Sequence, residues 1–435
     1  MYIQRPEIYS IDKQCYRFEV WRIFITMETK KLVVFGYGQR GRGYAAFAKK
    51  HPAKFALAAI IEINEEKIQA AKEQHPGVPI FTDYREFLRQ KISADVVAVA
   101  TQDEQHKEHA IGMMEAGYHL LLEKPISNNI ADCRAIYQAS KKYDRKVVVC
   151  HVLRYTPYYS TIKKYIDDGE LGEIVTIHAS ENVGYYHQAH SFVRGPWRNS
   201  KESSPMILAK CCHDMDIIRY LMGERCLSIN SYGGLYYFNE KNAPKGCAQY
   251  CSECKYENCP YNAQKLYTMP HIKEFAGYFT LKVEDEEIIK ELKGTQYDKC
   301  VFKTDNDVVD HQVTVMQFEN GKTACHTMTA FSKEIYRDIK IHGTKAELVG
   351  VIESNKFEIR YFGGETKEVN VDLSAVDVGG HGGGDYYLMN GLYELLNGKE
   401  VAGISYLDVS LESHLMSLNA EESRLQNGKT IKIEI

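Results

Sequence analysis

The stretch LVVFGYGQRG, residues 32–41, joins a short apolar run to a glycine-rich turn. Gly36, Gly38 and Gly41 fit the spacing G-x-G-x-x-G between a predicted strand and a predicted helix. In that arrangement the first glycine permits a tight turn, the second lets a pyrophosphate approach the backbone, and the third allows close packing of helix on strand. The stretch predicts the first turn of a dinucleotide-binding domain. A glycine-rich turn without a ligand is the alternative, and the strand–turn–helix context argues against it.

The choice of dinucleotide depends on Glu62, which ends the second apolar run about 20 residues after the glycines. An acid at this place binds the ribose hydroxyls and repels a 2′-phosphate, so the sequence favours NAD over NADP. Arg40 and Arg42 lie near the turn and keep NADP as the less favoured cofactor.

Outward from this stretch, short apolar runs alternate with helix-like segments as far as Cys150. The runs are LVVF, FALAAII, DVVAVAT, YHLLLE and KVVVC. Continuous apolar runs separated by helical segments are typical of parallel strands with crossover helices. We therefore predict an α/β fold that begins with a doubly wound parallel (Rossmann) sheet.

After Cys150 the apolar residues alternate with polar ones, as in EIVTIHASE, DHQVTVMQFENGKTACHTMTAF, RDIKIHG, KFEIRYFGG and KEVNVDL. This pattern predicts a C-terminal α+β domain with an open, mostly antiparallel sheet that has one face in water. The predicted organisation is an N-terminal extension at 1–30, an NAD-binding Rossmann domain at 31–150, and a substrate and oligomerisation domain at 151–435. Within the last domain we predict a cysteine-rich insertion at 240–265 and closing helices at 385–427.

The composition excludes several classes of protein. The 435 residues are 44% hydrophobic and 26% charged, which is typical of globular proteins rather than disordered or fibrous ones. The net charge of −4 gives no electrostatic attraction to nucleic acid or to an anionic membrane. No apolar run reaches the roughly 18 residues of a membrane helix, and residues 1–26 lack the apolar centre of a signal peptide. We expect a cytoplasmic protein with reduced thiols.

The run LLLEKPIS, residues 120–127, ends a predicted buried strand in an acid, a base and a proline. A strand interior tolerates neither an unpaired lysine nor a proline, so Glu123, Lys124 and Pro125 should lie where the strand leaves the sheet. Strand ends of this kind are where α/β proteins place their ligands.

Three motifs together resemble one family. GYGQRG, ATQDEQHKEHAIGMMEAGYHLLLEKPIS and CHDMDIIRYLMG are similar to the glucose-fructose oxidoreductase, inositol dehydrogenase and MocA (Gfo/Idh/MocA) family, and the similarity runs from Lys31 to the C-terminus. The resemblance implies that Lys124 lies beside the nicotinamide and acts on the substrate hydroxyl, that a cis peptide bond precedes Pro125, and that His213 assists. The cofactor-binding residues implied are Gly36, Gly38, Gln39, Arg40, Gly41, Glu62, Thr101, His106, Glu123 and Lys124.

The second catalytic segment departs from the family pattern D-x-x-x-H. Ala209 stands four residues before His213, where the family has a carboxylate, and Lys210 follows it. We therefore expect the alcohol-binding network to be rebuilt. A lysine serves as a base when burial or a neighbouring cation lowers its pKa, and Lys210 is a candidate for that cation. A structural ion pair with Glu123 is the alternative role for Lys124.

A loop with the sequence GYYHQAHSFVRGPWRNSKESSPM is dense in histidine, arginine and tryptophan. Aromatic faces pack on the C–H surface of sugars and forked donors bind hydroxyls or acids, so this loop is a candidate substrate wall. An interface loop is an equally favoured interpretation, and zinc at its two histidines is only weakly indicated. The predicted substrate-binding residues are Arg154, Tyr155, His187, His190, Arg194, Trp197, Arg198, Lys210 and Asp214.

Four cysteines, Cys247, Cys251, Cys254 and Cys259, lie close together in the sequence GCAQYCSECKYENCPYN. Thiolates satisfy tetrahedral zinc, so a structural zinc site is the favoured interpretation in a reducing compartment. Free thiols, a disulfide and an iron–sulfur cluster are the alternatives, because the spacing matches neither a double C-x-x-C finger nor a common ferredoxin run.

These patterns predict an NAD-dependent oxidoreductase that acts on a secondary hydroxyl or carbonyl of a sugar, polyol or glycoside, with Lys124 as acid and base and His213 assisting. A redox-assisted glycoside lyase or hydrolase with tightly bound, internally recycled NAD is the first alternative. A non-catalytic ligand-binding protein is less favoured, because Lys124 and His213 are both present. By the same resemblance we expect a homo-oligomer, a dimer or tetramer, formed through the C-terminal sheet.

Overall fold

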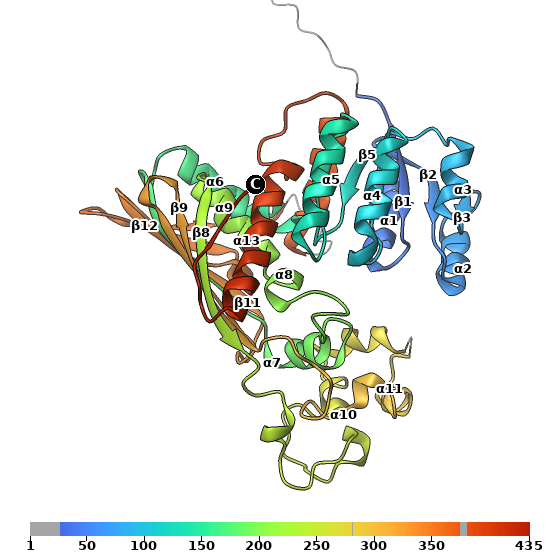
Figure 1. Ribbon diagram of the computed structural model, residues 1–435, viewed down its shortest axis with the longest axis vertical. Coiled ribbons are helices and arrows are strands. Elements are labelled where there is room, and N and C mark those ends of the chain that lie inside the picture. Colours follow the sequence, from blue (N-terminus) through green and yellow to red (C-terminus); the bar gives the residue numbers. More distant parts are fainter. Residues whose placement is uncertain (1–26, 281, 375–380) are drawn as a thin grey trace, which may run out of the picture.

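The computed structural model describes residues 27–280, 282–374 and 381–435, so most of the predicted N-terminal extension lies outside the described residues. The first part of the chain forms a six-stranded parallel sheet in the order β3-β2-β1-β4-β5-β6 (Figure 1). Its strands are buried on both faces, which explains their continuous apolar sequences. The elements are β1 (Lys30–Phe35), α1 (Gln39–Lys50), β2 (Phe55–Ile61), α2 (Glu65–Gln74), β3 (Ile80–Phe81), α3 (Tyr84–Gln90), β4 (Val96–Val99), α4 (His106–Glu115), β5 (His119–Leu122), α5 (Ile130–Lys142) and β6 (Val147–Val149).

The second part of the chain builds a nine-stranded sheet in the order β14-β13-β12-β11-β7-β10-β9-β8-β15. Only the β7–β10 pair is parallel among its described pairs, so the predicted α/β fold with a mostly antiparallel second sheet is confirmed. The elements are α6 (Pro157–Asp167), β7 (Ile174–Asn182), α7 (Tyr185–His187), the π-helical η3 (Gln188–Arg194), α8 (Met206–Ala209), α9 (Cys212–Met222), β8 (Cys226–Gly234), α10 (Ala263–Leu266), α11 (Asp285–Leu292), β9 (His311–Phe318), β10 (Thr323–Thr329), β11 (Tyr336–Gly343), β12 (Ala346–Val351), β13 (Lys356–Tyr361), β14 (Thr366–Asn370), α12 (Gly384–Leu396), α13 (Leu407–Leu425) and β15 (Ile431–Lys432).

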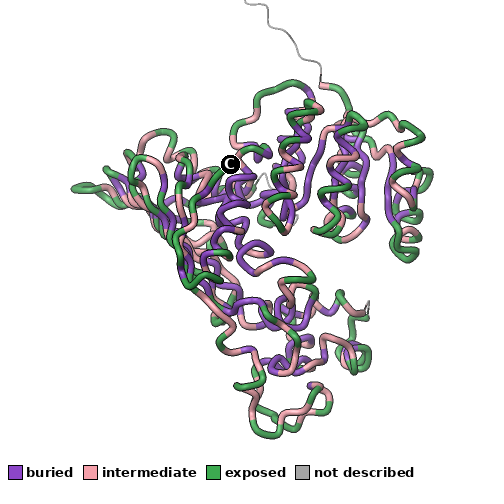
Figure 2. Tube along the Cα trace, in the orientation of Figure 1, coloured by how far each residue is buried: buried purple, intermediate pink, exposed green. Residues whose placement is uncertain are grey.

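The large sheet has one buried face and one face in water. Along β9 every second residue is buried and the others are exposed, which is the alternation predicted from the sequence. Helices α6, α9 and α13 cover the buried face, and the purple interior of Figure 2 lies between these helices and the sheet. No helix within the described ranges is long and apolar enough to cross a lipid bilayer.

Helix α12 comes late in the sequence but packs on the first sheet. Leu388, Met389 and Leu392 are buried in the same apolar cluster as Val34 of β1 and Phe55 of β2. The predicted boundary at residue 150 assigns α12 to the second domain. The side chains of α12 nevertheless complete the core of the first domain. The cofactor-binding unit is discontinuous along the chain.

The pKa values of buried histidines predict how stability responds to pH. Burial lowers the pKa of His109 and His326 to about 4, and that of His190 and His414 to about 3, from an ordinary value of 6.5. Below about pH 6.5 the unfolded chain takes up these protons and the folded chain does not. We expect the free energy of unfolding, measured by urea denaturation, to fall between about pH 6.5 and pH 5, by up to about 1.4 kcal/mol per pH unit for each histidine.

The variant His414→Gln removes one of these groups, and its free energy of unfolding should fall less steeply over the same pH range. A wild-type stability that stays constant or rises on acidification would contradict the assignment of these histidines as buried and neutral.

Candidate active site

The three glycines of the first turn differ in the space around them. A Cβ atom on Gly36, whose φ is +93°, would lie 2.5 Å from the carbonyl oxygen of Ala100, and one on Gly41 would lie 1.9 Å from that of Gly36. A Cβ atom on Gly38 would meet nothing within 4 Å. Two glycines are therefore required by packing, whereas the open space at Gly38 is what a pyrophosphate needs to approach the start of α1.

A pocket of about 490 Å³ opens beside this turn, at the carboxyl ends of β1, β2 and β4. Gly36, Gly38, Glu62 and Thr101 line it. The carboxylate of Glu62 accepts backbone N–H groups of Tyr37 at 2.7 Å, Ile63 at 2.8 Å and Asn64 at 2.9 Å. Since a carboxylate has about four acceptor positions, the oxygen bonded to Tyr37 keeps one for a ribose hydroxyl. The predicted residues therefore fit an NAD cofactor, and Gly38 and Glu62 would hold it.

Arg40, at the start of α1, and Glu123, just after β5, form an ion pair. Arg40 Nε is 2.5 Å from Glu123 Oε1, and its Nη2 is 2.7 Å from Asp385 Oδ1 of α12. Burial alone would raise the pKa of Glu123, but Arg40 and the hydroxyl of Tyr44 outweigh it and lower that pKa. Arg40 is thus engaged by two carboxylates of the protein.

His106 connects the pocket to the LLLEKPIS strand end. Its Nδ1 lies 2.8 Å from the carbonyl oxygen of Pro125, and its Nε2 lies 3.2 Å from that of Thr101. The peptide bond between Lys124 and Pro125 is cis. His106 is fully buried, so it positions these two loops rather than offering a surface to the cofactor.

Lys124 leaves the sheet at the end of β5 and points to the second domain. Its Nζ donates to the carbonyl oxygen of Ala209 at 3.1 Å. In the described part of the chain, no carboxylate lies within ion-pairing distance of this nitrogen. The alternative role of Lys124 as the ion-pair partner of Glu123 is therefore not what the geometry favours, because Arg40 occupies that carboxylate.

His213 stands in the first turn of α9, within reach of the charge of Lys124. Burial, and next the charge of Lys124, lower the pKa of His213 well below its ordinary value, so the ring is neutral. Its Nδ1 is buried and has no hydrogen-bond partner among the described groups. The ring centroid lies 6.4 Å from that of His381, whose Nδ1 lies 2.9 Å from Asp385 Oδ2. Position 209 offers no carboxylate, because it is an alanine. A carboxylate is present nearby in Asp385, which is bound to His381.

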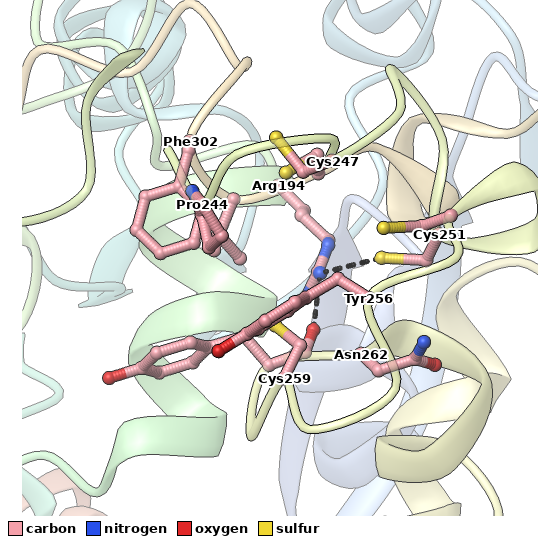
Figure 3. Close-up of a pocket in the computed structure, with 12 residues that line it drawn as sticks. Arg194, Pro244, Cys247, Cys251, Tyr256, Cys259, Asn262 and Phe302 are labelled. Atoms are coloured by element: carbon pink, nitrogen blue, oxygen red, sulfur yellow. Dashed lines mark hydrogen bonds between the residues drawn. The ribbon is translucent and has the colours of Figure 1, made fainter. Parts of the chain in front are cut away.

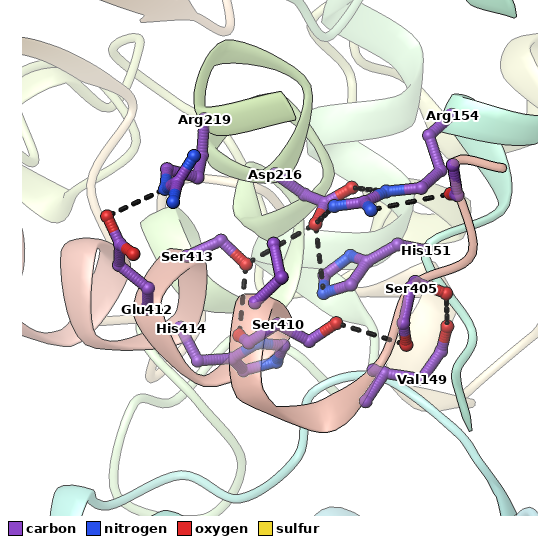
Figure 4. A network of polar contacts seen from close by, with 12 residues as sticks. Val149, His151, Arg154, Asp216, Arg219, Ser405, Ser410, Glu412, Ser413 and His414 are labelled. Atoms are coloured by element: carbon purple, nitrogen blue, oxygen red, sulfur yellow. Dashed lines mark hydrogen bonds and ion pairs between the residues drawn. The ribbon is translucent and has the colours of Figure 1, made fainter. Parts of the chain in front are cut away.

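Behind His213 lies a buried polar network, shown in Figure 4. Arg154 forms a forked pair with Asp216, with Nε 2.8 Å and Nη2 2.5 Å from the two carboxylate oxygens. His151 Nε2 lies 3.8 Å from the same carboxylate. The hydroxyl of Tyr155 is 2.8 Å from Ser405 Oγ. Arg154 and Tyr155 were predicted as substrate-binding residues, but their polar groups are satisfied inside the protein.

The predicted substrate wall is largely an internal interface. His190 is stacked between the rings of Phe275 and Tyr297, with centroids 4.7 Å and 5.0 Å away. Arg194 is fully buried and donates to the carbonyl oxygens of Lys299 and Tyr261, both at 2.7 Å. His190 and Arg194 hold the insertion between β8 and β9 in place through these internal contacts.

The remaining predicted substrate residues have varied surroundings. Arg198 pairs with Asp305 at 2.8 Å near the surface, and Trp197 is half-buried beside Phe192. Arg337 pairs with Asp214 at 2.9 Å and also with Glu181. Lys210 Nζ lies 3.4 Å from Glu181. The carboxylate of Glu181 therefore partly offsets the positive charge of Lys210.

His187 lies near Lys210. Burial, and next the charge of Lys210, lower the pKa of His187 well below its ordinary value. Among the predicted substrate residues, Lys210 directly follows α8, Asp214 lies in α9, and His187 lies near Lys210, close to the contact of Lys124 with Ala209.

A dinucleotide-binding sheet with a glycine cradle, joined to a second domain that contributes a histidine opposite a lysine, defines a class of NAD-binding oxidoreductases. The comparisons with known proteins agree. Residues 30–151 match the model "Oxidoreductase family, NAD-binding Rossmann fold", and residues 163–376 match "Oxidoreductase family, C-terminal alpha/beta domain". The chain belongs to the Gfo/Idh/MocA family of oxidoreductases, and the predicted resemblance is confirmed.

Individual relatives are distant. YteT of Bacillus subtilis strain 168 is 24% identical over 418 residues, which cover 86% of this chain and 93% of YteT. Levoglucosan dehydrogenase of Pseudarthrobacter phenanthrenivorans is 28% identical over 205 residues, or 46% of this chain and 52% of that protein. A solved levoglucosan dehydrogenase in complex with NADH and levoglucosan has a TM-score of 0.68 at 20% identity, covering 94% of this chain and 100% of that one. This structural likeness shows the same fold.

The open space at Gly38 gives a test of cofactor placement. A methyl group there fits the folded chain but occupies the place of the pyrophosphate, so Gly38→Ala should weaken NAD binding at least about tenfold with an unchanged melting temperature. Titration calorimetry and thermal unfolding measure the two quantities. Gly43→Ala, inside the helix that Gly38 precedes and also without neighbours within 4 Å, is the matched control and should bind NAD as the wild type does. Equal affinity in both variants would place the cofactor elsewhere.

The buried Arg154–Asp216 pair gives a test of the network behind the site. Asp216→Asn leaves a buried guanidinium without its anion, and we expect a loss of about 3–5 kcal/mol in the free energy of unfolding, measured by urea denaturation. The double variant Arg154→Met/Asp216→Leu removes both charges and should lose less than Asp216→Asn. The pair has no structural importance if Asp216→Asn is as stable as the wild type.

Proposed function

We propose that the protein is an NAD-dependent oxidoreductase acting on a secondary hydroxyl or carbonyl group of a sugar, polyol or glycoside. The observation that carries the proposal is the position of Lys124, between the cofactor-binding sheet and the neutral His213 of α9. NAD supplies the hydride acceptor when bound. Relatives named as inositol and levoglucosan dehydrogenases support the choice of substrate class. The free acceptor position on Glu62 supports NAD rather than NADP.

In this proposal Lys124 and His213 handle the proton of the substrate hydroxyl. The contact of Lys124 with the carbonyl oxygen of Ala209 can be exchanged for the hydroxyl, because no carboxylate competes for the nitrogen among the described residues. The neutral ring of His213 accepts a hydrogen bond or a proton. The ring of His381, which pairs with Asp385, lies 6.4 Å from that of His213, and His381 is a positioning residue whose charge helps to keep His213 neutral.

The test is the variant Lys124→Met, assayed for NAD reduction against a panel of sugars and polyols. Loss of a general base lowers kcat by about 100-fold or more, while the Kd for NAD should stay within about twofold of the wild type. Lys72→Met, at an exposed position of α2, is the control and should keep full activity. A wild-type turnover that survives in Lys124→Met would remove this lysine from the mechanism.

A redox-neutral glycoside lyase or hydrolase is the second candidate, because Ala209 removes the carboxylate of the dehydrogenase pattern. The nicotinamide content of the purified protein, measured after denaturation, separates the two. An empty site that binds NAD reversibly supports the dehydrogenase. Stoichiometric NAD that remains bound, with cleavage of glycosides and no net NADH, supports the second candidate instead.

A further inference from the structure

Five cysteines line one small cavity in the insertion between β8 and β9 (Figure 3). Four belong to the cluster predicted from the sequence, and the fifth comes from the segment after α11. An antiparallel bridge between Tyr250 and Lys299 holds the two segments together, with a hydrogen bond of 2.9 Å from Cys300 N to the carbonyl oxygen of Gln249. The five are Cys247, Cys251, Cys254, Cys259 and Cys300.

The thiols are close to one another but not bonded. All five are free, the Cys300 and Cys247 thiols are within hydrogen-bonding reach, and Cys259 is near enough to Cys251 and Cys254 for electrostatic interaction. No three of these sulfur atoms lie mutually within 4.8 Å in the described ranges. Coordination of one ion at about 2.3 Å therefore requires the thiols to turn inward about their Cα–Cβ bonds.

A buried arginine points into the same cavity. Arg194 is 0% exposed, and its Nη2 donates to Cys251 Sγ at 3.5 Å. Its Nη1 is buried without a hydrogen-bond partner, and no described carboxylate lies within ion-pairing distance of the guanidinium. A buried cation without an anion is costly, so the site requires negative charge beside Arg194. Thiolates are the groups in the cavity that can supply it.

The size of the cavity indicates which metal group would fit. Its volume is about 10 Å³, which is close to the space of a single water molecule. One ion fits such a space. A donor set made only of sulfur, with room for one ion, suits zinc.

We propose that this cavity binds one zinc ion through the thiolates of Cys247, Cys251, Cys254 and Cys259, with Arg194 beside the site as its counter-charge. Each cysteine releases its proton to solvent on binding, so four thiolates and Zn²⁺ carry a net charge of −2 and Arg194 reduces it to −1. Cys300 lies next to Cys247 as a neighbour of the ligands. The ion fixes the insertion beneath η3 and performs no chemistry on the substrate.

Another group of possible ligands does not compete with this assignment. Cys211, Asp214 and His326 lie mutually within 4.8 Å and are buried. Arg337 already pairs with Asp214 there, at 2.9 Å. A guanidinium in that position repels a metal cation, so this second cluster is explained by its ion pair.

The test uses full-length protein purified without chelators and analysed by mass spectrometry for zinc and iron. We expect about one zinc per chain in the wild type and at least about fivefold less in Cys251→Ser. Cys325→Ser, which removes a cysteine of β10 outside the cavity, is the matched control and should keep its zinc, as should Cys300→Ser.

A second measurement covers the case in which Cys251→Ser fails to fold. Native wild-type protein is stripped of metal with a chelator and titrated with Co²⁺, which should give the near-ultraviolet thiolate-to-metal absorption of a tetrahedral sulfur site at about one equivalent. Absence of zinc together with absence of this absorption overturns the proposal. So does iron with inorganic sulfide, or loss of zinc from Cys325→Ser equal to that from Cys251→Ser. None of these outcomes depends on the oxidoreductase activity.

Discussion

The arrangement of the site depends on one buried carboxylate, that of Glu123. It receives Arg40 from the cofactor-binding helix α1 and the hydroxyl of Tyr44 one turn later. Arg40 in turn reaches Asp385 of α12. Because Glu123 directly precedes Lys124, this set of contacts fixes the lysine relative to the glycine turn and to the closing helix. A carboxylate as buried as that of Glu123 needs such partners to remain charged.

The second domain completes the site with groups that differ from the family pattern. Where that pattern has a carboxylate, the backbone carbonyl of Ala209 meets Lys124. The acids nearby are occupied, since Arg337 holds Asp214 and Arg154 holds Asp216. His381 and Asp385, which follow β14 and begin α12, approach His213 from a different part of the chain. The local charge balance is therefore rebuilt from distant segments.

The sequence was informative where a residue's role depends on its neighbours along the chain. Alternating strands and helices predicted the first sheet except for the short strand β3, and the period of two predicted most of the second sheet, without β12. Strand β8, with the sequence CLSINSYGG, was not predicted because its serines and glycines weaken that period. The glycine motif could also be recognised from the sequence, because its three glycines and the strand before them lie within ten residues. The roles of these glycines could be stated in advance from backbone geometry.

Prediction was poorer where partners lie far away in the sequence. Arg194 and His190 have the composition of a sugar site, but they meet Lys299, Phe275 and Tyr297 from an insertion whose packing no local pattern shows. Cys300 was missed for the same reason, since nothing along the chain relates it to Cys247. The role of Arg154 depended on Asp216, and composition alone could not distinguish an internal pair from a substrate contact.

The packing of α12 also affects how the protein is made. The ribosome delivers the chain from its N-terminus at about 5–20 residues per second, and domains usually fold as they emerge. Helix α1 covers part of the side of the first sheet that carries Val34 and Phe55, but the part of that side against α12 stays uncovered until Leu388 and Leu392 have been synthesised. For most of the translation of this chain, the nascent cofactor domain exposes an apolar surface, which is the kind of surface that chaperones bind.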